Sequence, residues 1–258
     1  MKLSALVLTK NEAMMIEDCL KQLEFADEII VLDQNSQDKT AEIAAKFTKQ
    51  VLKTEKLAFD ENRNMLANLA HGEWLLYLDT DERLNPQLIS EIKKVIFIDD
   101  KVAYYFPRKN FILGRWLKHA GFWPDYVPRL FKKENLITWY GSIHESPQIK
   151  GTFGYLKTPI DHLTARSLNS MLEKSIKWAK IEAELFYKAH HPEVTAFKVI
   201  KVSLSEFVTR YFLKLGFLDG TVGLIQSIYQ ALHQAIVLTY LWEFQNDVVK
   251  KYEKIKGE

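Results

Sequence analysis

Cysteine is almost missing from this chain of 258 residues, in which Cys19 is the only one. A single cysteine excludes an intramolecular disulfide and fits a reducing compartment. A basic excess is missing too, because 35 Lys and Arg residues stand against 33 Asp and Glu residues. Proteins that bind nucleic acid usually carry such an excess, so we expect no nucleic-acid partner.

Long hydrophobic runs are scarce. The first, residues 3–8, is too short for the core of a signal peptide, so we expect a cytoplasmic protein. Residues 220–242 contain no charged residue, which raises the question of a transmembrane helix. Polar residues within this stretch, among them Gln226 and His233, favour a packed or interfacial helix instead.

Short apolar runs alternate with amphipathic stretches in the first hundred residues. The runs predict strands at 3–8, 28–32, near 51 and at 74–78, and the amphipathic stretches predict helices at 13–23, 40–47, 60–70 and 87–97. Met14 is expected on the apolar side of the first helix. This alternation predicts an α/β fold with a mainly parallel sheet and helices on both faces. Such sheets bind ligands at the carboxyl ends of their strands.

The composition changes twice after this part. Residues 102–162 hold five of the seven prolines and many aromatic residues, which predicts irregular strands and loops. After Ser167, the pattern predicts helices over 168–189, 194–215 and 221–252. We therefore expect a catalytic domain over residues 1–165 and a C-terminal helical region over residues 166–258.

The strongest local signal follows the strand predicted at 74–78. Asp79 and Asp81 stand there with Thr80 between them. At a strand end this spacing lets Asp81 ligate a hard divalent cation, while Asp79 reaches a ribose or a metal-bound water. An isolated Asp-x-Asp is usually a solvated turn, and its position after a buried strand is what favours a site.

Other strand ends and one helix carry further candidates. Asp33 follows the second strand and is suited to accept hydrogen bonds from a base or ribose. Leu8, Thr9 and Glu12 end the first strand and are placed to frame a nucleotide, although Glu12 is equally suited to begin a helix. Arg63, on the helix before Asp79, is a candidate for phosphate, with an exposed helix arginine as the alternative.

Together these segments resemble family 2 glycosyltransferases over about residues 3–165. The matching elements, in order, are Leu8-Thr9-Lys10-Asn11-Glu12, Val31-Leu32-Asp33, Arg63-Asn64 and Asp79-Thr80-Asp81. The chain departs from the family at Asp33-Gln34-Asn35-Ser36, where Asp-Asp-Gly-Ser is common. The resemblance implies a GT-A fold, a nucleotide-sugar donor that is usually UDP-linked, Mg or Mn, and inversion at the anomeric carbon.

Later segments resemble a bacterial subgroup. Arg129-Leu130-Phe131, residues 139–145 and residues 211–220 are similar to β-1,4-glucosyltransferases that extend heptose in the inner core of lipopolysaccharide or lipooligosaccharide. This resemblance implies UDP-glucose as donor and a glycolipid acceptor. The resemblance to the broader family implies Glu145 as the base that takes the acceptor proton, with His144 as second candidate. A buried ion pair that holds the loop is the alternative for His144 and Glu145.

Two further residues and the helical region complete the expected site. His162 is a candidate metal ligand or diphosphate contact, and Arg166 is a candidate for phosphate, although each has a structural alternative. Lysines and aromatic residues interleave beyond residue 166, which suits peripheral attachment to the inner face of the inner membrane. A face packed on the catalytic domain or on another subunit explains the same pattern.

Three other functions fit parts of the pattern. The same fold can act on another acceptor, whether a different glycan or a polypeptide. A sugar-nucleotide nucleotidyltransferase would need a Gly-rich basic loop near the N-terminus, and none follows Leu8. A non-catalytic nucleotide-sugar-binding protein remains open, although the presence of Asp79, Asp81 and Glu145 argues against it.

Overall fold

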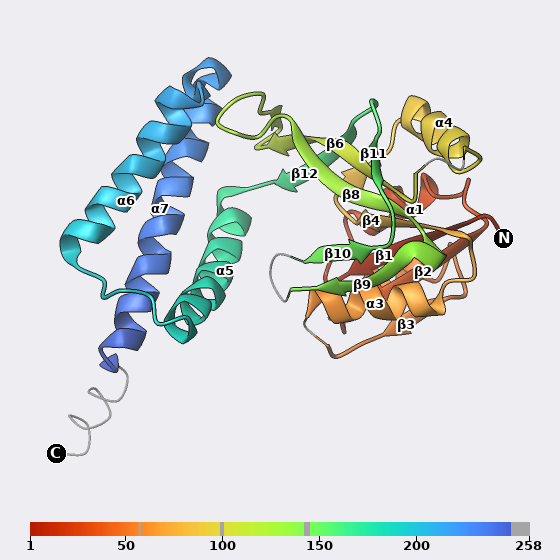
Figure 1. Ribbon diagram of the computed structural model, residues 1–258, viewed down its shortest axis with the longest axis horizontal. Helices are drawn as coiled ribbons and strands as arrows, with labels where there is room; N and C mark the ends of the chain where they lie inside the picture. The colour runs from red at the N-terminus through yellow and green to blue at the C-terminus, as the bar shows by residue number, and fades with distance from the viewer. Residues whose placement is uncertain (57, 99–100, 142–144, 249–258) are drawn as a thin grey trace. The chain divides into compact units, whose positions relative to one another are not determined.

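A computed structural model describes residues 1–56, 58–98, 101–141 and 145–248. The chain forms two compact units (Figure 1). The first contains Met1–Lys109 and Pro124–Leu163, and the second contains Asn110–Trp123 and Thr164–Glu258.

The secondary structure alternates strands and helices in the first unit and is mainly helical in the second. The strands are β1 Leu3–Thr9, β2 Glu28–Asp33, β3 Val51–Lys53, β4 Trp74–Asp79, β5 Glu82–Arg83, β6 Ala103–Ile112, β7 Arg115–Trp116, β8 Asp125–Lys132, β9 Leu136–Tyr140, β10 Ser146–Ile149, β11 Phe153–Tyr155 and β12 Ile160–Ala165. The α-helices are α1 Ile16–Lys21, α2 Thr40–Ala44, α3 Phe59–Leu69, α4 Pro86–Val95, α5 Leu168–Lys188, α6 Ala196–Val208 and α7 Gly220–Gln245.

The strands form one mixed sheet and one hairpin. The order in the sheet is β3-β2-β1-β4-β8-β6-β12-β5, with β7 and β11 also paired to β6, and β9 pairs with β10. The pairs among β1 to β4 are parallel, whereas β8 runs antiparallel to both β4 and β6. This architecture confirms the predicted α/β fold of GT-A type, with helices at the C-terminus.

Helices cover both faces of the sheet. Successive side chains of a strand point to opposite faces, and the buried side chains of β1 pack against helices on each face. Ala5 and Val7 of β1 pack with residues of α1, α2 and α4 on one face. Leu6 and Leu8 pack with Leu66 of α3 on the other. All seven residues of β1 are buried, as expected for a central strand covered on two sides.

The first helix is shorter than the sequence indicates. It begins at Ile16, because the Glu12 carbonyl accepts hydrogen bonds from the amides of Met15 and Ile16 and forms a turn there. Met14 lies in this turn and is 87% exposed, so its predicted place on the apolar side is wrong. Apolar spacing alone does not show where a turn replaces the first helical residues.

Residues 102–162 are more regular than predicted. Strands β6 and β8 have ten and eight residues, and both join the main sheet. The register between them shifts after Tyr104, so that Tyr105 pairs with Pro128. An irregularity of this kind tolerates a proline within a strand, which explains why Pro128 does not break the sheet.

A buried carboxylate joins three segments of the first unit at the amino end of β1. Glu28 accepts hydrogen bonds from Ser4 Oγ, Gln50 Nε2 and the His71 amide, and the His71 ring Nδ1 lies 2.8 Å from Glu28 Oε1. Burial raises the pKa of Glu28, but the hydrogen bonds outweigh it and lower the pKa from 4.5 to about 2. The ionised carboxylate therefore stabilises the fold.

We expect Glu28 to make stability depend on pH. Its contribution, about 3 kcal/mol, is complete above pH 4.5 and is lost as the pH falls toward 2, because the unfolded state then binds the proton more readily. In urea unfolding between pH 3 and pH 7, Glu28→Gln should be less stable than the unchanged chain at pH 7 and approach it at pH 3. Glu73→Gln, which removes an exposed partner of Lys2, is the control. Parallel curves for the two variants would contradict this account.

The second unit is built on α7. Val237, Leu238 and Leu241 of α7 form a core with Ala179 and Ala183 of α5. α6 packs on the same helix. Within the described residues, none of the helices combines the length and apolar content that a membrane crossing requires.

A buried aspartate ties the segment Asn110–Trp123 to the other residues of the second unit. Asp219, 3% exposed, accepts hydrogen bonds from the amides of Lys118 and His119, and its Oδ1 lies 3.0 Å from His119 Nδ1. The Ala120 amide donates to the Lys214 carbonyl at 2.8 Å. These bonds give a structural role to Asp219, which lies in the segment 211–220 noted in the sequence.

Candidate active site

The carboxyl ends of three parallel strands meet at one edge of the sheet. In the register, Leu8 pairs with Leu32 and with Asp79, and Thr9 pairs with Asp33. Four of the predicted site residues therefore come together, as their positions at strand ends indicated. This is the edge at which α/β sheets bind ligands.

Asp79 lies between two guanidinium groups. Arg63 Nη2 donates to Asp79 Oδ1 at 3.3 Å, and Arg129 Nη2 donates to Asp79 Oδ2. Burial raises the pKa of the Asp79 carboxyl, but the positive charges of Arg129 and Arg63 outweigh it and hold that pKa well below its ordinary value. Asp79 therefore stays ionised through the neutral pH range.

Arg129 and Glu82 form the support of Asp79, and neither was among the predicted site residues. Arg129 Nη2 donates to Glu82 Oε1 at 2.7 Å, and the Asp79 amide donates to Glu82 Oε2 at 3.1 Å. The Glu82 side chain is fully buried. A local signal exists for both residues, since Glu82 follows Asp81 directly and Arg129 lies in the Arg-Leu-Phe segment.

Removing Arg129 should destabilise the first unit strongly. Arg129→Met removes the guanidinium that lies 2.7 Å from the buried carboxylate of Glu82 and leaves, among the residues that the structure describes, only that of Arg108, at 3.7 Å. Breaking a buried pair in this way costs about 3–5 kcal/mol. Lys132→Met on the same strand removes a surface pair with Glu134 and should cost at most about 1 kcal/mol. Urea unfolding of both variants measures the difference. Equal small losses would show that Arg129 contributes no more than a surface charge.

Arg63 joins Asp79 to Glu145. Its Nε and Nη2 donate to Glu145 Oε1 at 3.1 and 3.0 Å, and its side chain is 5% exposed. The guanidinium also lies 4.9 Å from the ring centre of Trp139, so an aromatic face helps to hold it. Arg63 is therefore not an exposed helix arginine, and its position orients the carboxylate proposed as the base.

Asn64 fixes the strand that carries Trp139. Its Nδ2 donates to the Trp139 carbonyl at 2.8 Å, and its Oδ1 accepts from the Trp139 amide at 2.8 Å. A side-chain amide that pairs with both backbone groups holds β9 against α3. The adjacent residues Arg63 and Asn64 thus act as a pair, one on the carboxylates and one on the strand beside them.

These side chains surround a cavity of about 330 Å³. Its lining comprises Arg63, Asp79, Arg108, Val127, Pro128, Arg129, Trp139, Glu145 and Ser146. Arg108 at its wall pairs with Asp125 at 2.8 Å. The cavity therefore combines a carboxylate able to accept a proton, a carboxylate held ionised and an aromatic side chain.

Asp81 and His162 were predicted as metal ligands, and they face each other in the structure. His162 Nε2 lies 3.4 Å from Asp81 Oδ2, because β12 pairs with β5 and brings His162 opposite Glu82. Among the described residues, no group of three or more His, Cys, Asp or Glu side chains is arranged to hold a metal ion. The Asp81 carboxylate is a ligand of the kind that a hard divalent cation takes together with diphosphate oxygens and water. The assignment of His162 as a ligand stays a prediction.

The segments predicted for the nucleotide are tightly bonded to each other. Both Asp33 oxygens accept from Ser36, through its amide at 2.9 Å and its hydroxyl. The Thr9 carbonyl accepts from the Gln34 amide at 2.8 Å, and the buried Thr9 hydroxyl has no hydrogen-bond partner in the described part of the chain. The Glu12 amide donates to Thr40 Oγ1, which joins the first loop to the second. Their contacts with a nucleotide stay a prediction.

Three remaining predicted residues have different positions. Thr80 is buried between the two aspartates, and its carbonyl accepts a hydrogen bond from Arg83. Arg166 belongs to the second unit, so its assignment to the diphosphate stays a prediction. His144 lies outside the described residues, and its role as second candidate for the base stays a prediction as well.

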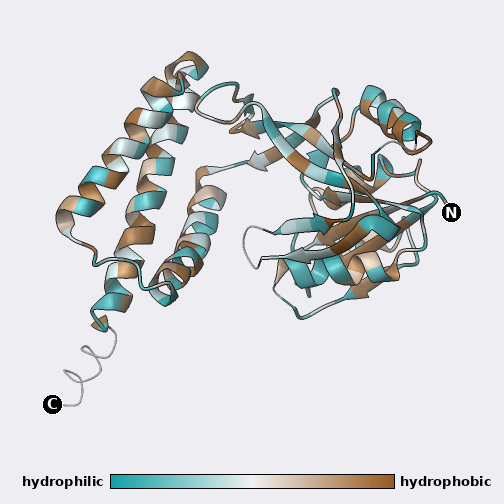
Figure 2. Ribbon diagram, viewed as in Figure 1, coloured by the Kyte–Doolittle hydropathy of each residue, from teal (hydrophilic) through white to brown (hydrophobic). Residues whose placement is uncertain are grey.

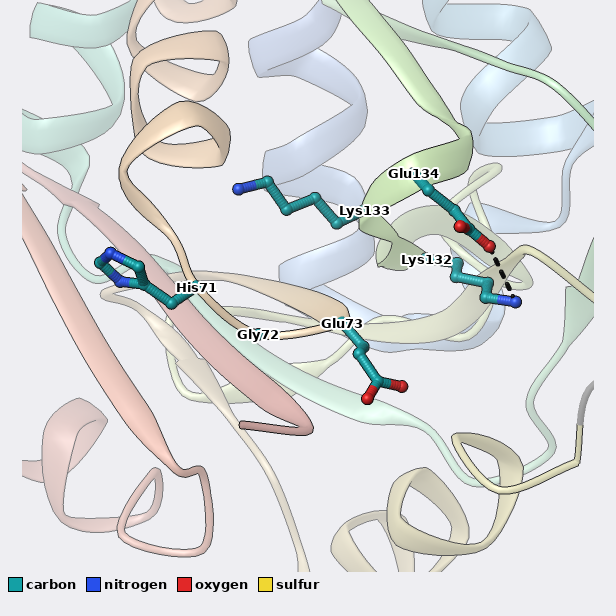
Figure 3. Close-up of a pocket in the computed structure, with 6 residues that line it drawn as sticks. All are labelled: His71, Gly72, Glu73, Lys132, Lys133 and Glu134. Atoms are coloured by element: carbon teal, nitrogen blue, oxygen red, sulfur yellow. Dashed lines mark ion pairs between the residues drawn. The ribbon is translucent and has the colours of Figure 1, made fainter.

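A second hollow of about 610 Å³ lies at the opposite edge of the sheet, between the start of β4 and the end of β8 (Figure 3). Its charged side chains are matched locally: Lys132 pairs with Glu134 at 3.0 Å, and Glu73 pairs with Lys2 at 2.7 Å. Lys133 donates to the Ala70 carbonyl. Because its charges are satisfied within the protein, this hollow does not compete with the site at the carboxyl edge.

The model of the family "Glycosyl transferase family 2" matches residues 4–163, which is more than half of the chain. The chain belongs to this family and is a glycosyltransferase. Membership supports the nucleotide-sugar donor that the resemblance of the sequence implies, and the match covers Asp33, Arg63, Asp79, Asp81 and Glu145.

Individual relatives agree with the family. The chain is 24% identical to an uncharacterized glycosyltransferase of Rickettsia conorii over 263 residues, covering 94% of this chain and 90% of that protein. It is 31% identical to one of Rickettsia bellii over 139 residues, covering 53% of this chain and 45% of that protein. Among solved structures it is similar to S. aureus TarS in complex with UDP-GlcNAc, with a TM-score of 0.48, 15% identity, and coverage of 96% of this chain and 92% of that one.

Proposed function

We propose that the protein is a metal-dependent, inverting hexosyltransferase. In this proposal it moves glucose from UDP-glucose to a sugar of the inner core of lipopolysaccharide or lipooligosaccharide, at the inner face of the inner membrane. The observation that carries the proposal is the convergence of Glu145, Arg63 and Asp79 on one cavity beside Asp81 and His162. The donor and acceptor come from the resemblance to inner-core glucosyltransferases.

Glu145 is the base in this scheme. It takes the proton of the acceptor hydroxyl as that oxygen attacks the anomeric carbon, and the bond from this carbon to the diphosphate breaks. Arg63 holds Glu145 through two hydrogen bonds to one oxygen, Oε1, so that Oε2 is not used by this pair. Single displacement on the face opposite the leaving group inverts the anomeric configuration.

Asp81 and His162 would hold a Mg or Mn ion in this proposal. Such an ion neutralises charge on the diphosphate as it leaves. Asp79 stays ionised beside them and is suited to bind the ribose or a metal-bound water. Leu8, Thr9, Glu12, Asp33, Thr80 and Arg166 complete the proposed donor site.

Product analysis tests the proposal. The purified chain is incubated with Mg and a panel of UDP-sugars, with inner-core glycolipid that ends in heptose as acceptor. Addition of one hexose from UDP-glucose, and not from the other donors, is expected. Transfer only to a different glycan or to a polypeptide would keep the enzyme class and overturn the acceptor. Donor binding without transfer to any acceptor or water would favour a non-catalytic binding protein.

A further inference from the structure

The helix α6 is hydrophobic on two sides. Val199 and Val202 face inward and pack against the core that α7 provides. Its opposite side carries a row of exposed apolar side chains that continues into the next turn, and we name this row the α6 stripe: Phe197, Ile200, Leu204, Val208, Phe212 and Leu213. Figure 2 shows hydrophobic residues along the length of α6.

The α6 stripe has the spacing of one helix face. Its first four members follow at intervals of three or four residues, which places them in a line. Phe197 is 73%, Ile200 66% and Leu204 60% exposed, and no residue of α6 is fully buried. A contiguous apolar side that is exposed to solvent normally marks an interaction surface, so the outer side of α6 needs a partner.

The charges beside the stripe show which partner fits. Lys198, Lys201, Arg210 and Lys214 lie within or just after α6, and the one acidic residue from Ala196 to Leu215, Glu206, is paired with Arg210 at 2.7 Å. A second copy of the chain packed on this face would bring two basic borders together. Anionic lipid headgroups would be attracted to the same borders while the acyl region receives the apolar side chains.

We propose that the α6 stripe is a membrane-docking face, which lies in the headgroup region of an anionic bilayer with its apolar side chains inserted. This face would bring the enzyme to a lipid surface, where a glycolipid acceptor lies. Only the identity of that acceptor rests on the proposed function.

Vesicle sedimentation with the full chain tests this surface. The unchanged chain should bind vesicles of phosphatidylcholine with phosphatidylglycerol and bind pure phosphatidylcholine more weakly. Ile200→Glu with Leu204→Glu should lower the partition coefficient at least about 100-fold, since each inserted aliphatic side chain contributes about tenfold or more. Ile176→Glu with Leu185→Glu is the matched control on α5, where both residues are also exposed. This control should retain most of its binding.

The basic border has its own test. Lys201→Gln with Lys214→Gln should weaken binding to anionic vesicles, leave the weak binding to neutral vesicles unchanged, and reduce the loss of binding caused by added salt. An unchanged salt dependence would show that these lysines do not meet the headgroups and would overturn the electrostatic part of the proposal.

Three results would overturn the membrane-docking face. The first is failure of the unchanged chain to bind anionic vesicles, and the second is equal binding by the Ile200 and Leu204 variant. The third is a dimer in light scattering that this variant converts to monomers, because a second copy would then cover the stripe. Hexose transfer from UDP-glucose to the glycolipid acceptor is measured in the same samples. Its absence in the unchanged chain would defeat the proposed function and leave the vesicle result standing.

Discussion

Glu145→Gln is expected to lower the turnover number by about 10²–10⁴-fold while the dissociation constant for UDP-glucose stays nearly unchanged. Glutamine has almost the same shape and can still accept the hydrogen bonds of Arg63, so the cavity should keep its form. It cannot accept the acceptor proton. A lower turnover number with an unchanged dissociation constant therefore shows that proton transfer is lost while the donor site keeps its structure.

Steady-state kinetics and calorimetry with the donor measure the two quantities. Glu134→Gln, which changes an exposed glutamate at the other edge of the sheet, is the control and should leave both unchanged. Full turnover by Glu145→Gln would transfer the role of base to another group. Two further carboxylate or imidazole groups would then be tested as the base: Asp125, the partner of Arg108 at the cavity wall, by Asp125→Asn, and His144 by His144→Ala.

Asp81→Ala is expected to abolish transfer and the increase in UDP affinity that Mn produces. The reason is that the carboxylate of Asp81 is one of two protein groups proposed to hold the ion, and the diphosphate supplies further ligands only when the ion is in place. The thermal midpoint should stay close to that of the unchanged chain, since Asp81 is not part of the Arg129–Glu82 pair. Calorimetry with UDP in the presence and absence of Mn measures the effect.

Two variants sharpen this test. Asp18→Ala removes an exposed carboxylate on α1 and should leave the effect of Mn on UDP binding intact. His162→Ala separates its two roles: a weaker effect of Mn supports a ligand, whereas an unchanged effect supports a structural partner of Asp81. Wild-type activity in Asp81→Ala would remove the metal site from the account.

The sequence predicts those parts of the site that depend on a single strand. Asp33 and Asp79 stand directly after buried runs, and the register of parallel strands brings such positions to one edge. The start of α4 is local too: Asn85 stands directly before Pro86 at the first helical position, and its side chain accepts from the Leu88 amide. Local composition is sufficient for these features because each depends on neighbours within a few residues.

The remaining features depend on pairings between distant segments. Arg129 reaches Asp79 because β8 runs antiparallel to β4, and no local pattern in residues 102–162 indicates this pairing. The contact between Arg63 and Glu145 likewise joins α3 to a loop far along the chain. Residues Asn110–Trp123 belong with the helical unit, and the bonds to Asp219 that tie them to it are visible only in three dimensions.

The exposed side of α6 shows a further limit of the sequence pattern. The lysines and aromatic residues of the helical region fit a membrane face and a packed face equally well. On α6 the structure shows one packed side, at Val199, and one exposed side, at Ile200. Periodicity gives the two apolar sides, but only packing shows which side is covered.

The anomeric configuration of the product tests the central claim most directly. Proton NMR during transfer from UDP-glucose, whose glucose is α-linked, follows the new linkage as it forms. Single displacement with Glu145 as base predicts a β-linked product from the unchanged chain and almost no product from Glu145→Gln. An α-linked product, or β-linked product formed equally fast by Glu145→Gln, would contradict the account.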